Sequence, residues 1–145
     1  LQPLMDSDVI HTLDGSDYPA SVLLSIADEL LKGEIALASG KNKQAIDHFT
    51  SAVAQQDKLP YMEPPFWYYP TRQSLGQALV IAGEYVSAEQ VYRKDLAAYP
   101  KNGWSMFGLI QSLEAQGKQE EAYKVKEMFD IVWSMSDVKL ESSRL

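Results

Sequence analysis

Three short segments of this chain carry a glycine that is followed five residues later by an alanine. The pairs are Gly40 with Ala45, Gly83 with Ala88, and Gly117 with Ala122. Apolar residues recur at helical spacing on both sides of each glycine, which predicts two helices joined by a turn in every segment. The glycine ends the first helix because it tolerates the left-handed conformation needed there. The small alanine lets the second helix approach the first closely.

The spacing of these segments indicates a repeat. The last two glycines are 34 residues apart, and the first two are 43 apart, or 34 plus an insertion of nine. A period of about 34 residues is typical of stacked helix–turn–helix units. Phe49 and Tyr92 follow their alanines by four residues and so share a helix face with them. Because no segment alternates as a strand would, we predict an all-α fold of about three helix pairs.

The middle segment resembles the tetratricopeptide repeat (TPR) family most closely. It has, at that family's spacings, Leu75, Gly76, Leu79, Ala88, Tyr92 and Pro100. Arg72 stands where the pattern has its first large aromatic residue, and the third repeat has Ile110 and Lys126 in place of the glycine and the aromatic. A departure in the last repeat is expected of a capping unit. The resemblance implies a right-handed α-solenoid built from helical hairpins.

The similarity extends over residues 20–145, which resemble the C-terminal part of large bacterial TPR proteins. The segments that carry it are "EPPFWYYP", "VYRKDL", "NGW" and "SDVKLESSRL". It implies that the chain is the end of a longer helical protein. It implies no reaction, so we expect no enzyme activity.

The expected organisation has three parts. An acidic lead-in covers 1–19, a TPR-like domain covers 20–135, and a tail covers 136–145. The repeats are expected near 26–57, 69–102 and 103–135, with an insertion at 58–68. The helices are expected near 20–39, 42–56, 67–82, 85–98, 103–116 and 119–135.

Composition excludes several classes of function. The net charge is −7, and residues 1–31 hold six acids and no lysine or arginine, so the basic surface of a nucleic-acid-binding protein is missing. There is no cysteine, and His11 and His48 lack the spacing of a metal site. We therefore expect no cofactor and no metal. No signal peptide or apolar run of about 20 residues is visible, so we expect a cytoplasmic protein that does not enter membranes.

The insertion contains an unusual segment, "LPYMEPPFWYYP", at 59–70. It holds four of the seven prolines and five of the fifteen Phe, Trp and Tyr residues of the chain. Prolines reduce the entropy lost when a long connection becomes ordered, and the rings would anchor it against helices. Five aromatics so close together cannot all point into one core, however, so some rings could instead form a binding surface.

Two hypotheses for function follow. The first is a non-catalytic interaction or scaffolding module that binds a protein or peptide in a concave groove, docks on the rest of a longer chain, or forms a homodimer through an exposed repeat face. Its candidate contact residues are Tyr61, Trp67, Tyr68, Arg72 and Trp104. The alternative is a small-molecule-binding or accessory part of a larger enzyme, which a pocket with converging polar groups would favour.

Overall fold

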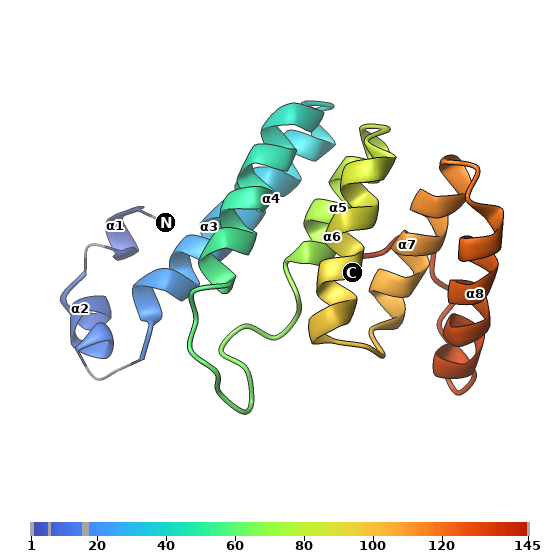
Figure 1. Cartoon of the computed structure of the whole chain (residues 1–145). Helices are drawn as coiled ribbons and strands as arrows, with labels where there is room; N and C mark the ends of the chain where they lie inside the picture. The colour runs from blue at the N-terminus through green and yellow to red at the C-terminus, as the bar shows by residue number, and fades with distance from the viewer. Residues whose placement is uncertain (1, 6, 16–17, 145) are drawn as a thin grey trace. The chain divides into compact units, whose positions relative to one another are not determined.

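All regular secondary structure that the structure describes is helical. The computed structural model describes residues 2–5, 7–15 and 18–144 (Figure 1). In chain order the helices are α1 Gln2–Met5, α2 Asp8–Asp14, α3 Ala20–Ala38, α4 Asn42–Gln56, α5 Arg72–Ile81, α6 Tyr85–Ala98, α7 Gly103–Ala115 and α8 Gln119–Trp133. The predicted all-α class is therefore confirmed. The chain divides into two compact units, Leu1–Thr71 and Arg72–Leu145, and each is described by itself.

The first unit is built on the α3–α4 hairpin. Gly40 turns the chain with a φ of +70°, and the amide of Lys41 donates to the carbonyl of Ala36 at 2.9 Å. This conformation is costly for residues with a side chain and easy for glycine, so Gly40 fixes where α3 ends. The role predicted for this glycine is confirmed.

Small residues hold α3 and α4 close together. Phe49 of α4 is fully buried, as are Ala45 and Ala52. Its ring lies directly over Gly33 of α3, where even a Cβ atom would overlap it. The close packing of α3 on α4 therefore depends on a large ring at Phe49 and on the lack of a side chain at Gly33.

The second unit repeats this construction twice. Gly83 has a φ of +78° between α5 and α6, and Gly117 has a φ of +75° between α7 and α8. In each turn the residue after the glycine donates its amide hydrogen to a carbonyl near the end of the preceding helix: Glu84 to Leu79 at 2.9 Å, and Lys118 to Leu113 at 3.0 Å. Thus all three glycines of the sequence pattern end a helix in the same way.

Tyr92 joins three helices of the second unit. It lies on α6 and is fully buried. One part of its ring covers Gly76 of α5, and the same ring also covers Gly108 of α7. A Cβ atom at either glycine would overlap the ring. Because Tyr92 is enclosed by both glycines, it couples the α5–α6 hairpin to the helix that follows it.

The α7–α8 hairpin uses a different aromatic contact. Lys126 occupies the position where the repeat pattern has an aromatic, and it pairs with Asp130 at 2.8 Å on the surface. Trp133, two turns further along α8, packs over Gly103 at the start of α7 instead. Lys126 replaces the aromatic residue of the pattern. The aromatic contact of this hairpin therefore forms where α7 begins and α8 ends.

The helix expected at 67–82 begins later than predicted, at Arg72. Residues 67–69 are bends, and Pro70 has no regular secondary structure. The residue before a proline is disfavoured in the helical region, and Pro70 places Tyr69 under that restriction. The helix therefore starts only after this proline.

The longest helix, α3, has 19 residues. Within the part of the chain that the structure describes, no helix is both long enough and apolar enough to cross a membrane.

Candidate interaction surface

The aromatic segment is fastened at its end by a single glutamine. Gln56, the last residue of α4, donates from Nε2 to the carbonyl of Tyr69 at 3.0 Å. Its Oε1 accepts from the amide and the hydroxyl of Thr71 at 2.7 and 2.8 Å. Thr71 is fully buried. These three bonds hold the end of the segment on α4 without extending the helix.

The rings of the segment form a cluster with an exposed member. The ring of Trp67 lies 5.6 Å from that of Tyr68 and 6.3 Å from that of Tyr69. Tyr68 and Tyr69 meet edge to face at 4.8 Å. Phe66 contacts Tyr18, which precedes α3, with 5.6 Å between centroids. The Phe66 contact thus joins the segment to the start of α3, and Trp67 and Tyr69 pack beside the exposed ring of Tyr68.

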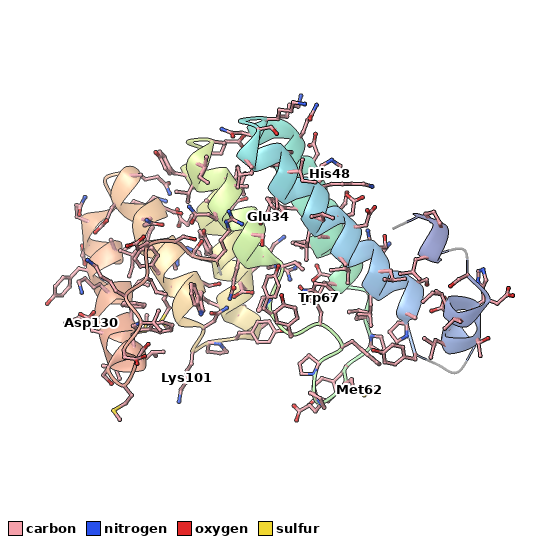
Figure 2. The ribbon with its side chains drawn as sticks, turned by 180° about the vertical axis from the view of Figure 1, so that it is seen from behind. Glu34, His48, Met62, Trp67, Lys101 and Asp130 are labelled. Carbon is pink, nitrogen blue, oxygen red and sulfur yellow. The ribbon has the colours of Figure 1, made fainter. Side chains whose placement is uncertain are left out.

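Of the three candidate residues in this segment, two are exposed and one is half-buried. Tyr61 is 86% exposed and Tyr68 is 78% exposed, which confirms the expectation that one of these rings faces solvent. Trp67 is half-buried, and its indole Nε1 is enclosed without a hydrogen-bond partner. Figure 2 shows Met62 at the outer bend of the loop and Trp67 closer to the helices. The segment therefore combines packing with exposure.

Tyr61 is held within its own segment. Its hydroxyl donates to Glu63 at 2.5 Å, and this bond raises the pKa of the Tyr61 phenol. The hydroxyl is therefore bonded within the segment, while the ring is exposed to solvent.

The other two candidates, Arg72 and Trp104, belong to the second unit. Arg72 is the first residue of α5 and is half-buried. Trp104 of α7 is also half-buried and meets Trp133 edge to face, with centroids 5.9 Å apart. The structure brings Trp67 and Tyr68 together in the first unit, and Arg72 and Trp104 belong to the second unit.

A buried carboxylate in the second unit serves the turn between α6 and α7. Asp95 accepts from Ser105 at 2.6 Å and from Asn102 at 2.7 Å. It is fully buried, and burial raises the pKa of its carboxyl, while the positive charge of Arg72 acts in the opposite direction. Both partners bond to Oδ2 and tie Asp95 to the turn, while its Oδ1 is buried without a hydrogen-bond partner.

A second carboxylate links α6 to α8. Glu89 accepts from Lys118 at 2.6 Å and from Arg93 at 2.8 Å, and Gln116 donates to it at 2.9 Å. The bond from Lys118 is the main cause that lowers the pKa of Glu89 to about 2. Arg93 also reaches Glu121 at 2.6 Å. The basic residues of this face are thus engaged in ion pairs within the unit.

A shallow pocket of about 330 Å³ lies beside this network, between α6, α7 and α8. Its lining is mostly apolar and includes Leu96, Met106, Leu109, Val125 and Met128, with Arg93 as its charged member. Such a lining suits an apolar side chain better than a reacting polar substrate.

The chain returns after α8 and inserts its end into the second unit (Figure 1). Ser143 is fully buried. Its amide and its hydroxyl lie 3.1 and 3.0 Å from Oε1 of Gln77 on α5, and its hydroxyl also meets that of Tyr92. A tail was expected at 136–145, but its contact with Gln77 through Ser143 was not, since a glutamine and a serine far apart in the chain carry no recognisable pattern.

Among the described residues, no three His, Asp or Glu side chains are grouped so that they could hold a metal ion. His48 instead meets Glu29 at 2.9 Å between α4 and α3.

Comparison with known proteins adds no assignment. No protein-family model matches the sequence, and neither curated proteins nor solved structures give a significant match. The TPR resemblance therefore stays a hypothesis that depends on the residues quoted above.

Proposed function

We propose that this chain is a non-catalytic, TPR-like interaction module that binds a protein or peptide. The observation that carries the proposal is the position of Tyr92 between Gly76 and Gly108. It makes one helical hairpin dock on the next through the same aromatic-on-glycine contact that forms inside each hairpin. Stacking of this kind is how repeat arrays produce extended binding surfaces.

The exposed aromatic residues supply the contact chemistry. Tyrosine combines a large ring with a polar tip and loses little conformational freedom on binding, which is why it is enriched at interfaces. Tyr68 is exposed, yet its ring is oriented by Tyr69. A ring that is already oriented costs less to immobilise in a complex. We therefore assign Tyr68 the leading role in partner binding.

A test places a photo-crosslinking amino acid at Tyr68 in the full chain within its host cell. Tyr123 of α8, which is 63% exposed, receives the same amino acid as the matched control. We expect one defined crosslinked protein from position 68 and none from position 123. The purified partner should then bind the Tyr68→Ser variant about tenfold more weakly than the Tyr123→Ser variant, the size of a typical hot-spot loss. Equal crosslinking at both positions, or none, would contradict the proposal.

Self-association is a further part of the proposal. Leu31 and Ile35 lie one turn apart on α3 and are 53% and 58% exposed, so they present an apolar stripe. Light scattering over a range of concentrations would show a dimer that Leu31→Lys abolishes. A monomer at every concentration would contradict the proposed self-association.

The alternative, a small-molecule or accessory enzyme function, has the pocket between α6 and α8 as its main support. Its only charged lining residue is Arg93, whose guanidinium is already paired with Glu89 and Glu121. Converging polar groups are what a substrate site needs. The pocket therefore favours docking of an apolar side chain.

A further inference from the structure

The tail that follows α8 is bound to the second unit as a peptide would be. Residues 137–141 have no helix or strand. Among the described residues, the backbone of 137–144 makes no hydrogen bond to the backbone of the helices. Its attachment to the helices instead uses side chains at a few points. A segment held in this way has no secondary structure of its own to lose when it leaves.

The attachment points are spaced along an extended segment. Near its start, Trp133 donates from Nε1 to the carbonyl of Val138 at 2.7 Å. Leu140 is then buried, with 8% of its surface exposed, and Ser143 is fully buried. Lys139 and Glu141, on either side of Leu140, are exposed. The segment therefore inserts a leucine and, three residues later, a serine.

The seat of Ser143 is selective for a small hydroxyl residue. Gln77 Oε1 accepts from both the amide and the hydroxyl of Ser143. The hydroxyl of Tyr92 is the second partner of the serine oxygen. An alanine in this position would leave the buried tyrosine hydroxyl without a partner, which costs more than the loss of one hydrogen bond alone. A larger residue would find little room beside the enclosed ring of Tyr92.

The stretch that connects α8 to this seat is exposed. Met135 is 95% exposed, and residues 134–139 are exposed throughout. The tail is thus tethered by a surface linker and held mainly by Leu140 and Ser143. A tether of this length gives the tail an effective concentration in the millimolar range. It can therefore occupy its seat almost fully even if its intrinsic affinity is weak.

We propose that the seat formed by Gln77 and Tyr92 is a peptide-binding site, and that residues 138–144 are its resident, displaceable occupant. The partner is an extended segment of another protein with a leucine followed three residues later by a serine. This inference rests on the proposed function and names the chemistry of its ligand. A partner can occupy the site only if it displaces the tethered tail, whose effective concentration is in the millimolar range.

The test measures binding of a fluorescent peptide with the sequence of residues 136–145 by anisotropy. The receptor is the full chain with Leu140→Asp, which weakens its own tail, and the wild-type chain is the comparison. We expect the variant to bind the peptide at least about tenfold more tightly than the wild type, because the resident tail no longer competes. A peptide with Ser143→Ala should bind about tenfold more weakly. The matched peptide with Ser142→Ala should bind as well as the original, since Ser142 bonds only within the tail.

A second version of the experiment is used if the Leu140→Asp variant does not fold. A protease site inserted in the exposed stretch 134–137 of the full chain allows the linker to be cut after folding. The resident tail should then dissociate on dilution, and the labelled peptide should take its place while the circular dichroism spectrum stays helical. Loss of helix on dilution, or no exchange of peptide in either format, would show that the tail is a structural cap and would overturn the inference.

Three further outcomes show which part of the reasoning fails. Concentration-dependent dimers of the wild type that disappear with Ser143→Asp would assign the seat to the tail of a second copy, which contradicts the proposed partner. Crosslinking from Tyr68 together with failure of peptide exchange would remove this inference and leave the proposed function standing. Peptide exchange without crosslinking from Tyr68 would support this inference and remove the role proposed for Tyr68.

Discussion

Replacing Gly108 with alanine should destabilise the protein, although alanine is the better helix former. In a helix, alanine is favoured over glycine by about 0.5–1 kcal/mol. At Gly108, however, the new Cβ atom would overlap the ring of Tyr92, which Gly76 encloses from another side. Overpacking of this kind typically costs about 1–3 kcal/mol. We therefore expect Gly108→Ala to lower the free energy of unfolding by about 0.5–2 kcal/mol, because overpacking outweighs propensity.

The sign of this effect should reverse when the ring is removed. Tyr92→Leu lacks the ring atoms that the new Cβ would meet, so Gly108→Ala in that background should stabilise by about 0.5–1 kcal/mol through helix propensity alone. Urea unfolding followed by circular dichroism at 222 nm measures all four members of the cycle. Gly117→Ala is the matched control, since its φ of +75° penalises alanine in open space and should do so equally in both backgrounds. Stabilisation by Gly108→Ala in the wild type would refute the close contact.

Two other predictions concern charge and the aromatic segment. The pKa of Glu89 lies at about 2 in the folded state, below its ordinary value of 4.5, so the stabilisation from its ion pairs is present above pH 4.5 and is lost as the pH falls toward 2. Urea midpoints should therefore fall less steeply between these pH values in Glu89→Gln than in the wild type, and identical slopes would contradict the assignment. Gln56→Ala should remove the bonds to Tyr69 and Thr71 and speed amide exchange of Thr71 at least tenfold, the effect of losing about 1.4 kcal/mol of local stability. Unchanged exchange at Thr71 would show that the aromatic cluster alone holds the segment.

The helical hairpins could be predicted because their determinants are local. A glycine that ends a helix and an alanine five residues later act within one turn and the helix beside it, so Gly40, Gly83 and Gly117 located the turns in advance. The start of α5 was misplaced by five residues. Helical periodicity continues through "FWYYP", and the bonds from Gln56 to Tyr69 and Thr71 join positions 13 and 15 residues apart.

The surface was predicted less completely than the fold. Aromatic density drew attention to Tyr61 and Tyr68, which are exposed. Aromatic density alone does not determine how far Trp67 is buried, because its burial depends on where the segment folds back. The contact of Ser143 with Gln77 spans 66 residues, and ordinary serines and glutamines occur too often for such a pair to be recognised from one sequence. The bonds of Asp95 likewise reach beyond its own helix, to the following turn and helix.

The position of Tyr92 has a consequence for how the second unit folds and melts. In repeat proteins, stability is the sum of a term for each repeat and a term for each junction between neighbours. A contact inside a hairpin adds to the first kind of term, whereas a ring shared between α5, α6 and α7 adds to both at once. Disrupting the α5–α6 hairpin therefore also removes the surface on which α7 docks. Because one ring contributes to both kinds of term, partly melted forms of this unit should be sparsely populated, and its helices should unfold as one cooperative block.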